Sequence, residues 1–540
     1  MTTAKDPALR EDVETLREEA GDRLREQIVQ GVLPRRQGPL PDPALTGHGI
    51  TSPLQGVPTR KEDGQTPQVS KSGYYSRMFG DLRAFTPSDD ALRKLGAPCG
   101  PMDANPPEKG ACLSGYAKVA DGQLMKDLPS GYTYFGQFLD HNITFQADAT
   151  FDPGNKPEQN PNYRSGRVSL EHVYGLGPQT QSFVYFDNDA AGKFWFDPEH
   201  PSDVPRNGEG VPIIADPRND NTIITIQLHL AFMKFHNAVV DMLRKRQVPE
   251  KQLFSMAQHA VVWHYQWLVL HDWLEKIIQP KVFEAISKEG GHFFRPTPEN
   301  PLALPVEFTV AGYRLHPLVQ EEYHLNERKS GRLFHFRKPF SPIPSDEVID
   351  WSFFFKTDQR APQQAKRFDA KVVHTFLNIP GPIDTPIEWI DNPAEQVPLP
   401  GRPEERYTPM RSIAIRNLLR GKAFGLPSGQ AVARRIQEKY GSEIIPKVYG
   451  NHDLGLEVAG LDEAPLWYYV MRESMLTEGG MRLGGVGSVI VGEVLFGLLS
   501  ADPSSFVSHN SKHPREPWKP TLGQSAGKFT MADMLKLAGV

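Results

Sequence analysis

The stretch Gly131-Tyr-Thr-Tyr-Phe-Gly-Gln-Phe-Leu-Asp-His-Asn-Ile-Thr-Phe145 places a strip of polar side chains in an aromatic and apolar run. On a helix, Gln137 and His141 stand four residues apart and share one face, and Asp140 lies three residues beyond Gln137. A buried polar group without a partner costs on the order of a few kcal/mol. The strip therefore predicts either a hydrogen-bonded core histidine or a functional site.

Helical periodicity dominates the chain outward from this stretch. Apolar residues recur at helical spacing in three long segments, and Thr530 fits the N-cap of a short closing helix. The best strand candidates are the short aromatic runs 183–186 and 193–196. The sequence thus predicts a mainly α fold, a single large helical domain with few short strands. The three long helical segments are 222–243, 254–278 and 465–499.

The first 70 residues differ from the rest. Residues 9–30 are densely charged but carry a narrow apolar stripe at helical spacing, which could pack on its own domain or on a partner. Residues 31–70 contain too many prolines for a helix or a central strand. We expect a charged helix and proline-rich arm at 1–70 and a separate helical domain at 71–540.

Composition excludes several classes of protein. The chain has 540 residues, 60 of them basic and 65 acidic, and the net charge of −5 gives no reason to expect nucleic acid as a partner. No run reaches the roughly 18 apolar residues of a transmembrane helix. The N-terminus does not resemble a signal peptide. With only two cysteines, Cys99 and Cys112, we expect a cytoplasmic protein with two free thiols. The alternative is a single disulfide between them.

A positive charge is held by the segment Asp216-Pro-Arg-Asn-Asp220. Asp216 fits the N-cap position and Pro217 the first helical position, so Arg218 falls in the first turn of a helix. The segment predicts either a rigid mount for a functional cation or a surface arginine beside Asp220.

Two more segments place polar residues in apolar surroundings. In 306–319, Tyr313 and His316 are three residues apart, on neighbouring positions of one helix face. In 413–428, Asn417 lies in an apolar helical run that ends at a Gly-Leu-Pro stop signal.

Together these segments resemble the peroxidase–cyclooxygenase superfamily, which contains the animal-type haem peroxidases and their bacterial relatives. The stretch at 136–142 is similar to the distal motif Gly-Gln-Phe-(Leu/Val)-Asp-His-Asp, the segment at 216–218 to the Gly-Asp-x-Arg motif, and the segment at 413–428 to the asparagine-bearing helix. The segments 162–175 and 479–487 also fit. The resemblance covers about residues 75–540, with the motifs in family order.

The resemblance implies a haem b with His316 as its proximal ligand and Asn417 bonded to the other ring nitrogen. On the opposite face, His141 would carry a proton between the peroxide oxygens, Arg218 would stabilise the developing charge, and Gln137 would line the pocket. The expected function is a haem-dependent peroxidase that reduces hydrogen peroxide or organic and lipid hydroperoxides. Its partners would be peroxide and a small-molecule or lipid substrate.

The sequence departs from the family at two cofactor positions. Members that bind haem covalently use an aspartate and a glutamate. Asp140 matches the aspartate, but Asn221 replaces the glutamate, so at most one ester link is expected, through Asp140. Calcium prefers charged oxygens, and the residues at the positions of the family's calcium site offer fewer of them, because Asn142 replaces an aspartate. These residues are Asn142, Ser165, Arg167 through its carbonyl, Ser169 and Glu171.

The proximal segment departs in a different way. It reads Tyr313-Arg-Leu-His316-Pro-Leu, one residue shorter than is usual in bacterial peroxidases of this type, and resembles the Tyr-x-x-His-(Pro/Ser)-Leu of cyclooxygenases, alpha-dioxygenases and fungal linoleate diol synthases. In those enzymes the tyrosine forms a radical that abstracts hydrogen from a fatty acid. Tyr313 is therefore either the radical residue of a fatty-acid dioxygenase or a core residue.

Two other classes of function fit the sequence less well. A catalytically silent haem-binding protein would have no need for His141 and Arg218 together with a proximal ligand. A non-haem di-metal centre requires two Glu-x-x-His motifs, and the histidine-bearing segments offer one, Glu321–His324. The remaining histidines are expected to satisfy hydrogen bonds between packed helices: 229, 236, 259, 264 and 271.

Overall fold

The computed structural model of the 540-residue chain describes most of the sequence. The proline-rich segment predicted at 31–70 lies outside the described residues, so its conformation stays a prediction. The described residues are 7–29, 75–107, 111–114, 118–145, 160–185, 192–296, 302–357, 360–379 and 396–540.

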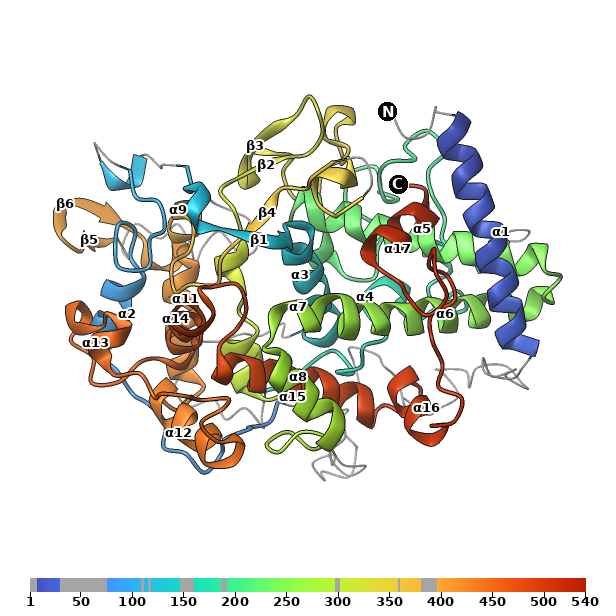
Figure 1. Cartoon of the computed structure of the whole chain (residues 1–540). Coiled ribbons are helices and arrows are strands. Elements are labelled where there is room, and N and C mark those ends of the chain that lie inside the picture. Colours follow the sequence, from blue (N-terminus) through green and yellow to red (C-terminus); the bar gives the residue numbers. More distant parts are fainter. Residues whose placement is uncertain are drawn as a thin grey trace, which may run out of the picture.

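The fold is mainly α, as predicted (Figure 1). Short 3-10 and π turns connect many of the helices. The α-helices that precede residue 300 are α1 (Pro7–Val29), α2 (Asp89–Gly96), α3 (Gly131–Ile143), α4 (Glu171–Tyr174), α5 (Ile223–Lys245), α6 (Glu250–Trp267), α7 (Glu275–Ile277) and α8 (Pro280–Glu289). Those that follow are α9 (His374–Leu377), α11 (Ile413–Ala423), α12 (Gly429–Tyr440), α13 (Asn451–Leu454), α14 (Leu466–Glu478), α15 (Gly485–Ala501), α16 (Phe506–Lys512) and α17 (Met531–Ala538).

Strands are few and short, and the sheets of the described residues are antiparallel pairs. The pairs are β1 (Leu124–Pro129) with β4 (Gln364–Lys366), β2 (Glu322–His324) with β3 (Ser330–Arg332), and β5 (Val397–Leu399) with β6 (Arg402–Tyr407). The two predicted strands were wrong. Residues Ser182–Val184 form a 3-10 turn, and a single bridge joins Tyr185 to Phe194, because this short segment packs on helices rather than on a sheet.

Helix α5 lies at the centre of the core. Its N-cap Thr222 accepts the amide of Thr225, and the helix packs against α3, α6 and α17. It is long and apolar enough to span a membrane, but 94% of its most apolar 18-residue window is buried inside the protein. This burial is that of a core helix of a globular fold.

Two predicted helices are interrupted. The segment 254–278 forms α6, a π-helix (η8, Leu268–Leu274) and α7, so Trp267 and Glu275 flank a widened turn. The segment 465–499 splits into α14 and α15, because Gly479 and Gly480 adopt positive φ angles that end the first helix.

Helix α1 lies along one edge of the molecule against α5 and α17 (Figure 1). Its apolar stripe of Leu16, Ala20 and Leu24 is buried there. Arg17 donates two hydrogen bonds to the Leu537 carbonyl, at 2.7 and 3.1 Å. The stripe therefore packs on the chain's own helices.

The expectation of two free thiols was wrong. Cys99 and Cys112 form a disulfide, with their Cα atoms 6.2 Å apart. In the described part of the loop between them, Asp103 accepts the amides of Cys99 and Asn105 and contacts His374 at 2.6 Å. Since disulfides persist mainly in oxidising compartments, one of the arguments for a cytoplasmic location is removed.

Candidate active site

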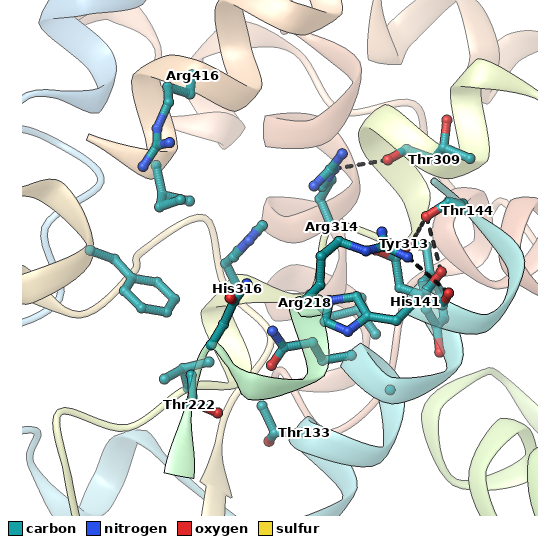
Figure 2. A pocket seen from close by; sticks show the side chains of 18 of the residues that line it. Thr133, His141, Thr144, Arg218, Thr222, Thr309, Tyr313, Arg314, His316 and Arg416 are labelled. Atoms are coloured by element: carbon teal, nitrogen blue, oxygen red, sulfur yellow. Dashed lines mark hydrogen bonds between the residues drawn. The ribbon is translucent and has the colours of Figure 1, made fainter. Parts of the chain in front are cut away.

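A cavity of about 720 Å³ brings together most of the predicted site residues. Figure 2 shows the labelled side chains of His141, Arg218, Tyr313 and His316 grouped around it. Asn417 lies behind His316, outside the cavity wall. The predicted residues that line the cavity are Gln137, Asp140, His141, Arg218, Tyr313 and His316, together with Asn221.

Helix α3 carries the distal residues of the cavity. Its packing depends on two glycines: a Cβ atom on Gly131 would lie 2.5 Å from the Phe354 carbonyl oxygen, and one on Gly136 would lie 2.8 Å from the Trp273 ring. The helix therefore approaches both neighbours closely, which fixes the direction in which Gln137 and His141 point. Gln137 accepts a long hydrogen bond, 3.4 Å, from the Thr225 hydroxyl of α5.

His141 is held from behind by two further polar residues. Its Nδ1 lies 2.8 Å from Oδ1 of Asn219, and the Nδ2 of Asn219 lies 2.9 Å from Nδ1 of His229. In this orientation the amide oxygen of Asn219 accepts a hydrogen bond, so the proton of His141 sits on Nδ1 and its Nε2 is a base. Burial, followed by the charge of Arg218, lowers the pKa of His141 to about 4 and keeps the ring neutral.

Arg218 is mounted as the sequence predicted. Asp216 is the N-cap of a 3-10 turn (η7, Pro217–Asp220) and accepts the amide of Arg218. The same carboxylate accepts two hydrogen bonds from the Arg218 guanidinium, which also donates to the His141 carbonyl at 2.9 Å.

The carboxylate of Asp216 is itself shared between two cations. It is fully buried and pairs with Arg164 as well as with Arg218. Burial alone would raise the pKa of Asp216, but the two guanidiniums outweigh this effect and hold the pKa below its ordinary value. Arg218 is thus fixed by a carboxylate that stays charged.

The proximal segment is not the continuous helix that was predicted. A π turn (η9, Phe308–Gly312) ends before Tyr313, and a 3-10 turn (η10, His316–Leu318) begins at His316. Pro317 has no amide hydrogen and restricts the residue before it, so a regular helix cannot run through His316. Tyr313 and His316 nevertheless both line the cavity.

His316 has the chemistry of a metal ligand. Its Nδ1 lies 3.2 Å from the side-chain amide of Asn417 on α11. Burial, followed by the charges of Arg314 and Arg416, lowers the pKa of His316 to about 3, so the imidazole is neutral. The Asn417 atom at this contact is Nδ2, which donates to Nδ1. A half rotation of the amide would place its oxygen against Nδ1–H, which would fix the tautomer that leaves Nε2 available to a metal.

Three arginines make one side of the cavity strongly positive. Arg314, Arg416 and Arg420 line it, and Arg314 is positioned by a 2.8 Å hydrogen bond to the Thr309 carbonyl (Figure 2). Burial and the neighbouring charge of Arg314 lower the pKa of Arg420 to about 10. An anion bound here would relieve this repulsion, and the two carboxylates of a haem would supply it.

Tyr313 has a partner that the sequence did not reveal. The indole N–H of Trp273 donates a 2.9 Å hydrogen bond to the Tyr313 hydroxyl oxygen. Burial raises the pKa of Tyr313 above its ordinary value, so the phenol is protonated. Sequence reasoning missed the three cavity arginines and also Asn219 and Trp273. Asn219 could have been noted from its place beside Arg218, but no sequence signal links Trp273 to Tyr313.

The residues of the expected calcium site lie together but bond mainly to one another. Oδ1 of Asn142 accepts the amides of Ser169 and Leu170, both at 3.2 Å. Glu171 accepts the amide of Ser165 at 2.9 Å, and the Ser165 hydroxyl accepts the amide of Arg167.

Four of the histidines set aside from a non-haem metal site make hydrogen bonds in the described structure: His229, His236, His264 and His271. His236 contacts the Tyr174 hydroxyl and the Gly192 carbonyl, and His264 accepts the amides of Thr521 and Leu522. Among the described residues, the one group of ligand atoms close enough for a metal contains the disulfide cysteines and Asp103.

Residues 181–369 match the family model described as animal haem peroxidase. A comparison with curated protein sequences gave no match.

The fold is similar to those of several solved structures. The fatty acid alpha-dioxygenase of Oryza sativa is 14% identical with a TM-score of 0.50, covering 99% of this chain and 94% of that one. A variant of the same enzyme with palmitic acid also scores 0.50 at 14% identity, covering 98% and 94%. Peroxidase A from Dictyostelium discoideum is 12% identical with a TM-score of 0.47, covering 88% and 99%. At these identities the dioxygenase structures show a shared fold.

Proposed function

We propose that the chain is a haem-dependent peroxidase of the peroxidase–cyclooxygenase superfamily. An animal haem peroxidase model matches residues 181–369, and the fold is similar to that of a fatty acid alpha-dioxygenase. The observation that carries the proposal is that His141, Arg218 and His316 line one cavity. His141 is neutral and Arg218 is charged, which is the pair of states that peroxide cleavage requires.

We assign the cofactor-binding residues from the same cavity. The proposed cofactor is haem b, with His316 as iron ligand, Asn417 as the partner of its Nδ1, and the arginine side of the cavity facing the two carboxylates. A bound haem supplies an iron that takes up the oxidising equivalents of peroxide. Asp140 and Asn221 both line the cavity, and because an amide cannot form the ester, at most one covalent link is proposed, through Asp140.

The distal residues perform the proton transfer. Nε2 of His141 accepts the proton of the bound peroxide and returns it to the oxygen that departs as water or alcohol. Asn219 keeps the other ring nitrogen protonated, so the basic nitrogen stays on the cavity side. Arg218, held against Asp216, stabilises the negative charge on the departing oxygen.

Calcium is not needed to explain the loop beside the distal helix. Asn142 uses Oδ1 on two backbone amides, and Glu171 is the one carboxylate in the set. Burial raises the pKa of Glu171, and its Oε2 has no hydrogen-bond partner among the described residues. A calcium ion requires six to eight oxygen ligands, so we propose that this loop is closed by its own hydrogen bonds.

The proposal is tested by replacing His141→Ala in the haem-loaded protein. Loss of the acid–base group is expected to slow peroxide reduction by about 10²–10⁴-fold while haem absorbance is retained. His271→Ala is the matched control, because His271 lies on the π-helix η8 and bonds to Glu275 outside the cavity. An unchanged rate in the His141 variant would remove this residue from the mechanism.

A second candidate function is fatty-acid oxygenation through a Tyr313 radical. Tyr313 lines the cavity with its hydroxyl fixed by Trp273, and the wall includes an apolar group that an acyl chain could contact. The fold is shared with alpha-dioxygenases, one of them a variant solved with palmitic acid. The apolar group is Leu333, Phe334, Phe376, Ile379 and Ile413.

An oxygen electrode separates the two functions. Palmitic acid and a trace of peroxide are added to the haem-loaded protein, and oxygen uptake that is lost in Tyr313→Phe supports the dioxygenase. Tyr265→Phe is the control, because Tyr265 is equally buried but does not line the cavity. Absence of uptake in the unaltered protein, or uptake that survives Tyr313→Phe, excludes the radical function with this substrate.

A further inference from the structure

Three aromatic residues form a continuous line from the cavity into the protein. Tyr313 lines the cavity and accepts the 2.9 Å hydrogen bond of Trp273. The Trp273 ring stacks on Tyr132, with the planes 7° apart and the ring centroids 6.2 Å apart. We infer that Trp273 and Tyr132 are redox-active and pass an electron to Tyr313 once Tyr313 has been oxidised. This inference rests on the proposed oxidation of Tyr313.

The fold places these rings with unusual backbone geometry. Trp273 lies in the π-helix η8, and Tyr313 directly follows the π turn η9. Such widened turns are rare and occur frequently at functional sites. Gly136 stands four residues after Tyr132 on the same face of α3, and its missing side chain makes room for the Trp273 ring. The stack therefore depends on features that an ordinary helical core does not need.

The outer end of the line has a proton acceptor. The Tyr132 hydroxyl donates a 2.8 Å hydrogen bond to Oδ2 of Asp272, a buried carboxylate that also pairs with Lys276 at 2.6 Å. The Lys276 ammonium lies 5.1 Å from the centre of the Tyr132 ring. A positive charge at this distance opposes a cationic tyrosine, so the phenolic proton must leave together with the electron.

The transfer balances in electrons and protons. Hydrogen peroxide is the oxidant of the proposed function, and its reduction to two water molecules takes up two electrons and two protons. Tyr313 supplies one electron and one proton, and the second oxidising equivalent would stay with the haem until a donor in solution supplies the other electron and proton. One electron then moves from Tyr132 through Trp273 to Tyr313. Tyr132 gives its proton to Asp272, Tyr313 regains a proton from the cavity, and Trp273 keeps its indole hydrogen. The result is a neutral Tyr132 radical and a restored Tyr313.

The line of aromatic residues leads from the cavity toward the protein surface. All three rings are at most 6% exposed, whereas the Lys276 side chain above the outer end is 35% exposed. The oxidising equivalent thus moves from the cavity to a position just beneath the surface. When no substrate occupies the cavity, a one-electron donor in solution can reduce the chain there, which protects Tyr313.

The experiment mixes the haem-loaded protein with hydrogen peroxide without a donor, freezes it and records electron paramagnetic resonance. Protein with ring-deuterated tyrosine or tryptophan identifies the radical in each sample. Tyr132→Phe is expected to abolish the Tyr132 signal and stop the radical at Trp273 or Tyr313. Trp273→Phe is expected to confine it to Tyr313, and Tyr313→Phe to remove the signals of all three residues.

Matched controls distinguish electron transfer along the line of Tyr313, Trp273 and Tyr132 from a general effect of substitutions in the core. Trp263→Phe replaces another buried tryptophan whose indole donates to a carbonyl, that of Ser504 at 2.8 Å, away from the line. It should leave the radical pattern unchanged. If Trp273→Phe does not fold, Tyr132→Phe removes a single hydroxyl and carries the test.

Two outcomes would overturn the inference, and they are distinguishable. A Tyr313-dependent radical that is unchanged in Trp273→Phe and Tyr132→Phe excludes electron transfer through these two residues and leaves the role of Tyr313 intact. Absence of any Tyr313-dependent radical in the unaltered protein excludes oxidation of Tyr313 itself, and the chain with it.

Discussion

The cavity has two walls that are built in different ways. The distal wall carries His141 and Arg218, and the proximal wall carries His316. On the distal wall, each proposed catalytic group is held by a second buried group: His141 by Asn219, and Arg218 by Asp216. On the proximal wall, His316 begins a short 3-10 turn, and among the described contacts its side chain has one hydrogen-bond partner, Nδ2 of Asn417.

The difference follows from what each wall is proposed to do. A proton-transfer group must keep one tautomer and one position before substrate arrives, so the protein supplies every constraint. A metal ligand gains a constraint from the metal itself, and one partner on its other nitrogen completes it. We therefore expect changes on the proximal wall to act on cofactor binding, and changes on the distal wall to act on rate.

The largest expected effect comes from His316→Ala. Removal of the proposed iron ligand should leave the purified protein with little or no haem, measured from Soret absorbance per protein, while distal variants keep it. His324→Ala is the control, because His324 is exposed on β2. Haem content in His316→Ala equal to that of the unaltered protein would refute the ligand assignment and the comparison of the two walls.

A smaller effect is expected on the distal wall from Asn219→Leu. This change removes the partner of His141 Nδ1 while keeping a side chain branched at Cγ, so haem binding should persist and peroxide reduction should slow by about 10–100-fold. The measurement is kcat/KM for peroxide as a function of pH.

The variant Asn219→Asp sharpens the same prediction. A carboxylate beside Nδ1 favours protonated His141 and raises its pKa from about 4, so activity should be lost at a higher pH as the solution is acidified. Asn237→Asp is the control, because Asn237 bonds only to the backbone of Phe194 among the contacts described. A pH profile that moves equally in both variants would show that Asn219 does not act through His141.

The sequence predicted best where local rules decide the structure. Asp216 and Pro217 begin a turn that positions Arg218, and Thr530 caps its helix, because capping depends on residues two or three positions apart. The shared face of Gln137 and His141 followed from helical spacing alone, and both residues line the cavity.

Prediction failed where distant segments or backbone irregularities decide the structure. The break between Gly312 and His316 was read as a continuous helix, since periodicity does not register a π turn followed by a proline. The contact of Trp273 with Tyr313 joins residues 40 positions apart and leaves no local signal. The pairing of Cys99 with Cys112 likewise depends on how the loop packs on His374.

The smallest expected effect is a loss of folding stability in acid, caused by buried histidines of α5, the helix that packs behind α3. His229 and His236 lie on α5, and burial lowers the pKa of each to about 4, against an ordinary value of 6.5. Between these values the unfolded chain binds more protons than the folded chain, so stability falls as the pH drops from about 6.5 toward 4. Each such histidine contributes up to about 1.4 kcal/mol per pH unit.

Urea unfolding at pH 7, 6 and 5 measures this slope, and His236→Gln provides the comparison. Glutamine can retain a hydrogen bond to the Tyr174 hydroxyl but does not titrate, so the loss of stability between pH 6.5 and 4 should become shallower. His374 changes stability with pH in the opposite direction. Burial lowers the pKa of His374, but Asp103 outweighs this effect and the pKa of His374 is raised. His452→Gln, at an exposed position, is the control. An equal slope in the His236 variant and the unaltered protein would mean that α5 is not the acid-sensitive support of the distal wall.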